Sequence, residues 1–380
     1  ETGGRMETGM SQKELKRVHL ANVAGSRLRG DDIPPGNVSS LESVKISGSA
    51  ILAMGRRGEL REWNGMQVMR GLSESFAARS GAPLALTIGN FDGVHRAHRA
   101  MLERTVEAAA DLELRPAVLT FHPPPKEFFA RRTGAGVLPR LSTLTDKLQR
   151  FREAGIEQVV IARFNDALAA QSAQEFIEVT LTQRLGTRWL LVGDDFRFGH
   201  KRAGTIDLLR AAPAFTVERM HTVVVDGERV SSTAIRAALQ AGGLEIAEKM
   251  LGRPYSITGR VAHGEKLGRA LGFPTANLPL RFTPPLAGIF AVRIDGLGEK
   301  SRYGVASLGT RPTVNEQARP LLEVFVFDFD EPIYGRRICV SFLHKLRDEV
   351  KYPDLDSLQA QIRRDADAAR AWVDRLETAS

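Results

Sequence analysis

The sequence has a single cysteine, Cys339, among its 380 residues. One thiol excludes an internal disulfide framework and any zinc site built on several cysteines. The neighbours Ile338 and Val340 are apolar, which predicts a buried strand position for this cysteine. Long apolar runs are also missing, because no segment approaches the roughly 18 residues that a membrane span needs. Near the start, Ala50–Met54 is too short for the core of a signal peptide. We therefore expect a cytoplasmic protein without a membrane partner.

Aromatic residues are scarce as well, at 7% of the chain, whereas the net charge is +8. An excess of positive charge favours anionic partners, which are either nucleic acids or phosphorylated small molecules. The basic residues are scattered along the chain and form no dense run, so we expect most of them to lie on a solvated surface. We expect no nucleic-acid partner, and the sequence leaves the oligomeric state open.

The chain divides into three parts by composition. Residues 1–65 are rich in glycine, serine and charge and show no sustained period, which predicts a mostly disordered extension. Met66 opens a more regular stretch, and it is a candidate for the natural start of the protein. A change in pattern near Met250 indicates a domain boundary, which gives a first domain over 66–248 and a second over 249–380.

In the first domain, short apolar runs alternate with helical patterns, which predicts a parallel sheet covered by helices. The predicted strands are Pro83–Ile88, Ala117–Phe121, Gln158–Phe164, Trp189–Val192 and Thr222–Val225. The predicted helices are one that runs through Met101 and Ala110, one over 173–184 and one over 231–239.

The second domain has short apolar or alternating runs punctuated by glycine and proline, which predicts a small antiparallel barrel. Its predicted strands are Tyr255–Val261, Gly288–Ile294, Tyr303–Leu308, Leu322–Phe327 and Ile338–Phe342. An amphipathic helix over Asp356–Leu376 closes the chain, with Leu358, Ile362, Ala369 and Trp372 as candidate buried positions.

The stretch Thr87–His98 leaves a buried strand and enters a helix, which is an arrangement that favours phosphate binding. Gly89 and Gly93 permit a close approach of the backbone. His95 and His98 are three residues apart, so their imidazoles share one helix face and can both donate to phosphate oxygens. Two surface histidines would give the same spacing. A zinc site would need further ligands, which are missing nearby.

The same stretch resembles the Gly-x-Phe-Asp-Gly-x-His-x-Gly-His motif of bacterial bifunctional FAD synthetases, with Ala97 in place of the usual glycine. The segments Leu119–Pro123, Val192–Gly199 and Val230–Arg236 resemble later motifs of that family, in the same order. The resemblance implies a Rossmann-like nucleotidylyltransferase domain. It also implies that His95, His98 and Arg236 contact ATP phosphates, with Asp195 placing the nucleotide or a metal. The other nucleotide-binding residues that it implies are Gly89, Asn90, Phe91, Asp92, Gly93, Ser231, Ser232 and Thr233.

In the second domain, Thr275 and Asn277 lie two apart on an extended segment and therefore share a face. A hydroxyl and an amide oxygen are hard ligands that suit Mg²⁺. A glycine-punctuated loop over 259–269 precedes them, but it has no Walker ending.

Pro274-Thr275-Ala276-Asn277 resembles the riboflavin kinase motif, and the preceding loop resembles the flap that covers ATP in that family. The resemblance implies a six-stranded antiparallel barrel with a terminal helix. Within it, Thr275 and Asn277 would hold Mg²⁺ and ATP, and Glu323 would be the general base. Gly259, Gly264 and Gly268 would bind the nucleotide through the flap.

The two resemblances together imply a bifunctional α/β enzyme of flavin cofactor synthesis, with riboflavin, FMN and ATP as its small-molecule partners. In this interpretation riboflavin is phosphorylated to FMN, and AMP is then transferred to FMN to give FAD. Two alternatives stay open at this point: nucleotide transfer to another phosphorylated metabolite, and a non-catalytic flavin- or RNA-binding regulator. The salt dependence of binding would identify an RNA-binding protein, since nucleic-acid affinity falls steeply with salt.

Overall fold

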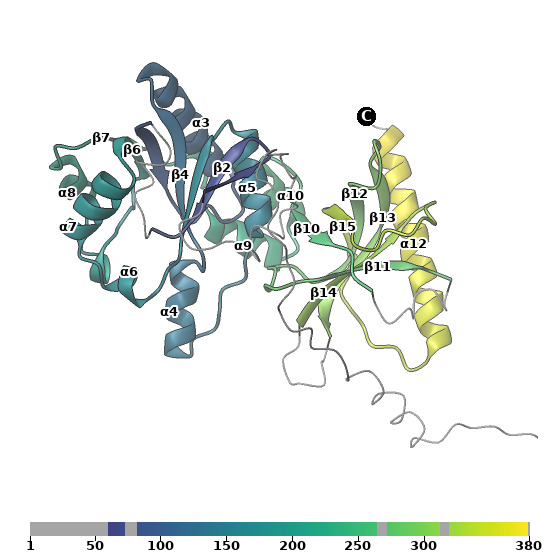
Figure 1. The fold of residues 1–380 in the computed structure, drawn as a ribbon. Coiled ribbons are helices and arrows are strands. Elements are labelled where there is room, and N and C mark those ends of the chain that lie inside the picture. The colour runs from purple at the N-terminus through teal and green to yellow at the C-terminus, as the bar shows by residue number, and fades with distance from the viewer. Residues whose placement is uncertain (1–59, 73–81, 264–271, 312–318, 379–380) are drawn as a thin grey trace, which may run out of the picture. The chain divides into compact units, whose positions relative to one another are not determined.

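The computed structural model describes residues 60–72, 82–263, 272–311 and 319–378, and Figure 1 shows their arrangement. A seven-stranded sheet forms the first domain, in the order β1-β2-β5-β4-β3-β6-β7. All of its neighbouring strands run parallel except β1, which pairs with β2 in an antiparallel hairpin. The strands are β1 (Leu60–Trp63), β2 (Met66–Arg70), β3 (Leu84–Ile88), β4 (Arg115–Phe121), β5 (Gln158–Ala162), β6 (Thr187–Gly193) and β7 (Thr216–Met220).

Helices cover both faces of this sheet, because its central strands are apolar on both sides. On one face, Phe151 from α5 and Leu102 from α3 pack against Val118 and Val159. On the other face, the core contains Leu119, together with residues of the helix η1. The helices of this domain are α3 (Arg96–Asp111), α4 (Pro125–Thr133), α5 (Leu144–Glu153), α6 (Asp166–Ala170), α7 (Ala173–Glu175), the π-helix η1 (Phe176–Arg184), the 3₁₀ helix η2 (His200–Arg202), α8 (Ile206–Arg210), α9 (Ser232–Gln240) and α10 (Leu244–Leu251).

The second domain is a six-stranded antiparallel sheet in the order β10-β15-β12-β13-β14-β11. It closes nearly into a barrel, since the end strands meet at a bridge between Ala262 and Asn277. The helix α12 (Leu355–Thr378) lies along the outside of this barrel and buries Ala366 and Ala369 against it (Figure 1). The strands are β10 (Ser256–Arg260), β11 (Thr275–Pro279), β12 (Gly288–Asp295), β13 (Arg302–Arg311), β14 (Arg319–Val326) and β15 (Arg337–Arg347).

This architecture confirms the predicted fold class, but several local predictions were wrong. The strand expected at Thr222–Val225 is reduced to Val224–Val225 in β8, which pairs only with β9 (Glu228–Arg229) in a separate hairpin. The last strand of the sheet is instead β7, whose polar edge position gave no apolar run. The helix expected over 173–184 is present as α7 and η1, although most of it is π-helical. Among the four positions expected to be buried on the last helix, only Ala369 is fully buried.

The predicted boundaries also differ from the observed elements. The strand β1 lies within the range expected to be an extension, and Trp63 is buried there. The helix α10 runs through Leu251, so a boundary between residues 248 and 249 would cut it. No helix among the described residues combines the length and the apolar character needed to cross a membrane.

Candidate functional sites

The first candidate site lies where the strand order of the parallel sheet reverses. From β3 the chain continues to β4 and β5 on one side, and β6 then pairs with β3 on the other side. Ligands of such sheets bind outside the carboxyl ends of the strands at this point. Two of the predicted segments, Gly89–His95 and Asp194–Gly199, leave the carboxyl ends of β3 and β6, so the fold brings them to the same edge.

A cavity of about 850 Å³ opens at this edge. Gly89, Asn90 and Asp195 line it, as do side chains that follow β4 and β5. Its apolar part is aromatic, and the phenylalanines that line it are Phe121, Phe129, Phe164, Phe176, Phe196 and Phe198. A volume of this size lies in the range of roughly 300 to 1,000 Å³ that is usual for small-molecule sites.

His95 and His98 lie together, as their spacing predicts. Their rings are stacked with the centroids 3.6 Å apart. His95 caps α3, because its Nδ1 accepts a hydrogen bond from the backbone N–H of His98 at 3.4 Å. A neutral His95 therefore carries its proton on Nε2 and keeps that nitrogen as a donor.

Both imidazoles are held in the neutral form. Burial lowers the pKa of His95 to about 4, the nearby Asp92 opposes this change, and Arg253 and Arg236 add to it. Burial also lowers the pKa of His98 well below its usual value, with further contributions from His95 and Lys147. The Nδ1 atom of His98 is buried without a hydrogen-bond partner among the described residues.

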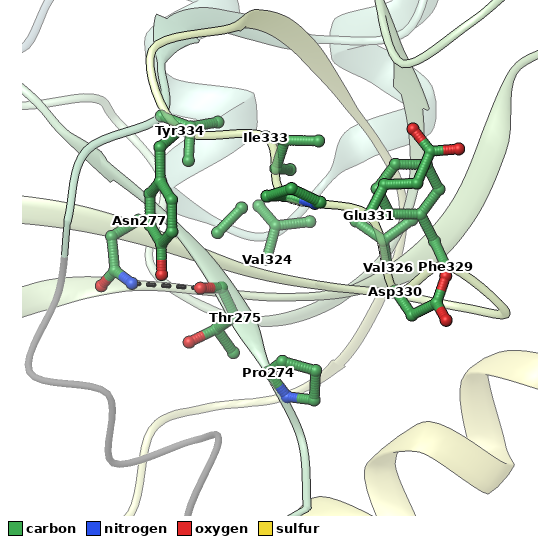
Figure 2. Close-up of a pocket in the computed structure, with 13 residues that line it drawn as sticks. Pro274, Thr275, Asn277, Val324, Val326, Phe329, Asp330, Glu331, Ile333 and Tyr334 are labelled. Carbon is green, nitrogen blue, oxygen red and sulfur yellow. Dashed lines mark hydrogen bonds between the residues drawn. The ribbon is translucent and has the colours of Figure 1, made fainter.

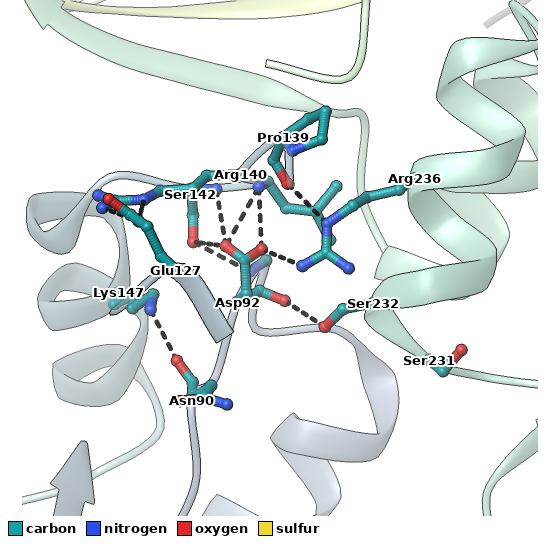
Figure 3. Close-up of polar contacts among 12 residues, drawn as sticks. Asn90, Asp92, Glu127, Pro139, Arg140, Ser142, Lys147, Ser231, Ser232 and Arg236 are labelled. Atoms are coloured by element: carbon teal, nitrogen blue, oxygen red, sulfur yellow. Dashed lines mark hydrogen bonds and ion pairs between the residues drawn. The ribbon is translucent and has the colours of Figure 1, made fainter. Parts of the chain in front are cut away.

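Asp92 is the centre of a buried polar network that joins three segments of the chain (Figure 3). Its carboxylate accepts hydrogen bonds from the backbone N–H groups of Leu141 and Ser142 and from the Ser142 hydroxyl. Arg236 donates to the same carboxylate at 2.6 Å and to the carbonyl oxygen of Pro139 at 2.7 Å. The Ser232 hydroxyl donates to the backbone oxygen of Asp92. In this structure Asp92 and Arg236 therefore satisfy one another inside the protein.

The remaining predicted residues of this site are more dispersed. Ser231 caps α9 by accepting from the N–H of Ala234, whereas Thr233 is exposed. Asp195 is exposed and pairs with Arg229 at 3.1 Å. Ala97, the departure from the family motif, is half-buried and packs against a core cluster.

Sequence reasoning missed several charged residues beside this site. Lys147 is buried and donates to the backbone oxygen of Asn90 at 2.6 Å. Glu127 is buried with ion pairs to Arg131 and Arg140. Arg253 donates to the backbone oxygens of Gly93 and Val94. A signal for Lys147 was present in the sequence, since the spacing of Leu144, Leu148 and Phe151 places this lysine on the apolar face of α5.

The second candidate site lies on β11 and β14 of the barrel. The register places Asn277 directly opposite Glu323, and Thr275 opposite Phe325. Directly opposed residues project to the same face of a sheet. Ala276 and Val324 fill the barrel core, so Thr275, Asn277 and Glu323 share its outer face. The strand pairing thus brings together the three residues that the sequence implied for this site.

A small cavity of about 80 Å³ reaches Thr275 and Asn277 (Figure 2). Asp330, Glu331 and Tyr334, from the segment that follows β14, line its other side. Glu323 is not among the described residues that line it. At this volume the cavity holds at most part of a nucleotide.

The donor set at Thr275 and Asn277 fits Mg²⁺ as a partial site. The Asn277 amide nitrogen donates to the backbone oxygen of Thr275 at 3.2 Å, which leaves the amide oxygen turned away from that contact (Figure 2). Two neutral oxygen ligands suit a cation that keeps several waters and takes the rest of its ligands from phosphates. No group of three or more histidine, cysteine or acidic side chains in the described ranges is arranged to hold a metal.

The loop predicted over 259–269 begins later than expected. Gly259 lies in β10, not in a loop, and a Cβ there would come 2.8 Å from the Leu278 side chain. This close packing between β10 and β11 explains a glycine at that position. Gly264 and Gly268 lie outside the described residues.

The chain matches two protein families and several characterised relatives. Residues 78–234 match the FAD synthetase family, and residues 251–373 match the riboflavin kinase family. The bifunctional riboflavin kinase/FMN adenylyltransferase of Haemophilus influenzae is 44% identical over 311 residues, which cover 81% of this chain and 99% of the relative. The Escherichia coli K12 protein of the same name is 44% identical over 312 residues, covering 81% and 98%.

A solved structure supports the fold over the same length. It is described as a macrolide-efflux protein from Streptococcus pneumoniae, and it superposes with a TM-score of 0.67 at 26% identity. The superposition covers 80% of this chain and 99% of that one. The identity to the bacterial relatives over nearly their whole length assigns both domains at once, and the chain belongs to the bifunctional riboflavin kinase/FMN adenylyltransferase (FAD synthetase) family.

Proposed function

We propose that this chain makes FMN and FAD. The barrel domain transfers the γ-phosphoryl group of ATP to riboflavin, and the sheet domain transfers AMP from ATP to FMN with release of pyrophosphate. Riboflavin, FMN and ATP as small-molecule substrates agree with both families. The observation that carries the proposal is the pairing of Glu323 with Asn277, because it sets a carboxylate beside a magnesium-type donor set.

In the kinase step, Glu323 accepts the proton of the ribityl hydroxyl as its oxygen attacks the γ-phosphorus. A carboxylate is a weak base for an alcohol, but it is sufficient when the proton leaves during the attack, as in kinases with a catalytic aspartate. Thr275 and Asn277 would hold Mg²⁺ together with the ATP phosphates. When bound, the cation would supply positive charge beside the transferred group.

In the adenylylation step, a phosphate oxygen of FMN attacks the α-phosphorus of ATP, and the bond to pyrophosphate breaks. No protein nucleophile is required, so positioning and charge neutralisation carry the catalysis. The stacked, neutral His95 and His98 donate ring N–H hydrogen bonds to phosphate oxygens, and the donor of His95 is Nε2 because its Nδ1 caps α3. Arg236 contributes to phosphate binding only if it leaves Asp92, since both are paired in this structure.

The aromatic cavity beside Asn90 is the proposed flavin pocket of the adenylylation step. A planar isoalloxazine ring fits a cavity walled by phenylalanine side chains, which stack on aromatic ligands or meet them edge-on. The ring centroids of Phe121, Phe128 and Phe129 each lie within 6 Å of that of Phe164, and Phe196 stacks on Phe198. Asp195 at its rim is the proposed contact to nucleotide or metal.

We also propose that the adenylylation domain ends with α10 and that the kinase domain begins with β10, since these are neighbouring elements of different folds. The nucleotide-binding roles of the remaining residues stay predictions. These residues are Gly89, Asn90, Phe91, Asp92, Gly93, Ser231, Ser232, Thr233, Gly259, Gly264 and Gly268.

The test is a separation of products by chromatography after incubation of the purified protein with riboflavin, ATP and Mg²⁺. FMN should appear first and FAD later. Glu323→Gln should abolish FMN formation, while supplied FMN is still converted to FAD. Glu299→Gln, at an exposed loop position, is the matched control and should behave as the wild type.

The reverse pattern is expected of His98→Ala, which should let FMN accumulate without FAD. His221→Ala, which removes an exposed histidine, is its control. Equal impairment of both steps by Glu323→Gln and His98→Ala would contradict the division into two sites.

A further inference from the structure

Lys147 is a buried cation whose environment the proposed chemistry leaves unexplained. It is 6% exposed, and its Nζ makes one hydrogen bond, to the backbone oxygen of Asn90 at 2.6 Å. An ammonium group has three donors, and burying its charge without an ion pair is costly. The described structure shows no ion pair between Lys147 and a carboxylate. A function at the loop that carries Asn90 would account for that cost.

The helix α5 contacts this loop through two side chains on the same face. Lys147 binds the oxygen of Asn90, and Phe151, one turn later, meets the ring of Phe91 edge-on with the centroids 5.2 Å apart. Phe91 is fully buried and has a φ of +48°. This left-handed conformation is uncommon for a bulky residue and persists only where the surroundings enforce it. The two contacts from α5 supply that constraint.

The constraint extends to the candidate catalytic histidine. The ring of Phe91 packs against the ring of His98, with the centroids 5.1 Å apart. On its other side His98 stacks on His95, and its buried Nδ1 has no hydrogen-bond partner in the part of the chain that the structure describes. Only Nε2 therefore remains as the ring nitrogen that can reach a ligand, and its direction is set by the two rings that enclose it.

We propose that Lys147 is a positioning residue of the adenylyl-transfer site, which fixes the Asn90–Phe91 turn through the Asn90 carbonyl oxygen and thereby aims His98 at the phosphates of ATP. This inference rests on the proposed function of the first site.

The charge of Lys147 gives the proposal a second readout. His98 is faced by His95 from the start of α3 and by Lys147 from α5, and each of them lowers its pKa. Lys147 itself is faced by the carboxylates of Asp92 and Glu127 and by the guanidinium groups of Arg140 and Arg236. Removing the ammonium charge therefore raises the pKa of His98, and protonated His98 becomes populated at a higher pH than in the wild type.

The experiment compares Lys147→Met with the wild type in the conversion of supplied FMN to FAD, using the full chain. Lys147→Met should lower kcat by about tenfold or more, as expected for a misplaced catalytic group, with a smaller change in KM for ATP. The acid limb of the kcat–pH profile should move to higher pH. Lys147→Arg, which keeps the charge and N–H donors, should retain more activity than Lys147→Met and leave the acid limb in place. Lys249→Met removes an exposed lysine of α10 and is the matched control for the change in net charge.

Two results would overturn the inference: kcat of Lys147→Met within twofold of the wild type, or a reduced kcat with an unshifted acid limb and a lower melting temperature. The second result would assign Lys147 to folding alone. If Lys147→Met does not fold, Lys147→Arg and Phe151→Leu replace it. An unchanged kcat in Phe151→Leu then contradicts the inference, whereas a reduced kcat with native thermal stability supports it. A wild-type protein that forms no FAD would instead refute the proposed function, so the two failures are distinguishable.

Discussion

At the scale of single residues, His95 couples the stability of the first domain to pH. Burial lowers its pKa from 6.5 to about 4, so between these values the unfolded chain binds a proton that the folded chain does not. The contribution of His95 to stability is therefore complete above pH 6.5 and is lost as the pH falls toward 4. Melting temperatures measured across this range should decrease toward acid, and His95→Gln should flatten that decrease. A slope as steep in His95→Gln as in the wild type would show that other groups dominate.

Ala97 offers a residue-scale test of the departure from the family motif. It is the second residue of α3 and packs against a core cluster, so its methyl group contributes to both helix formation and packing. Ala97→Gly should lower the free energy of unfolding by less than about 1 kcal/mol, because the full difference between alanine and glycine applies in a helix interior and Ala97 lies in the first turn of α3. Chemical denaturation measures this change. A gain in stability would mean that the methyl group is crowded.

At the scale of elements, α12 is attached to the barrel by a buried ion pair. Asp365 is buried and accepts two hydrogen bonds from the Arg347 guanidinium, at 2.9 and 2.6 Å. Asp365→Asn leaves the Arg347 guanidinium without its charged partner, but this side chain is 23% exposed, so the substitution should destabilise the domain by about 2 kcal/mol, less than for a fully buried pair. Asp328→Asn is the control, since Asp328 makes the same two-pronged contact with Arg370 in an exposed position. Denaturation should show a much smaller change for the control, because exposed pairs contribute little.

Some of the helices and strands could be predicted from the sequence, and others could not. The strand Leu84–Ile88 was predictable because all of its residues are apolar or small and buried. The strand at Ile338–Phe342 was predictable from its short, mostly apolar run, of which Ile338, Val340 and Phe342 are buried. The strand β7 could not be predicted, because an edge strand needs only a partly apolar face. Its residues Glu218 and Arg219 interrupt any apolar run. The π-helical turns of η1 were equally hidden, because the apolar spacing predicts a helix without its hydrogen-bond register.

In the candidate sites, local arrangements could be predicted from the sequence, whereas contacts between distant residues could not. Residues close in sequence, such as His95 and His98, were predictable from their spacing. The family resemblance implied roles for Asn277 and Glu323, but their direct pairing depends on the register of β11 and β14, which neither the resemblance nor composition gave. The bonds between Asp92, Ser142 and Arg236 join positions 50 to 144 residues apart, so no local pattern encodes them.

At the scale of the whole molecule, the two candidate sites have separate sets of residues on separate sheets, so each should take its substrates from solution. An equimolar mixture of Glu323→Gln and His98→Ala should therefore restore the conversion of riboflavin to FAD, because FMN released by one variant is adenylylated by the other. Chromatographic assay of the mixture measures this. Accumulation of FMN without FAD would show that FMN must pass within one molecule.

The near-closure of the barrel has a mechanical consequence. The segment just after β10 meets β11 at an isolated bridge, in which the N–H of Ala262 donates to the backbone oxygen of Asn277 at 2.8 Å. Asn277, whose side-chain amide is the proposed cation ligand, therefore also joins the two end strands of the barrel through its main chain. A nucleotide that binds the side chain of Asn277 should therefore alter the hydrogen bond between Ala262 and Asn277. Occupancy of the site and the separation of the two end strands should vary together.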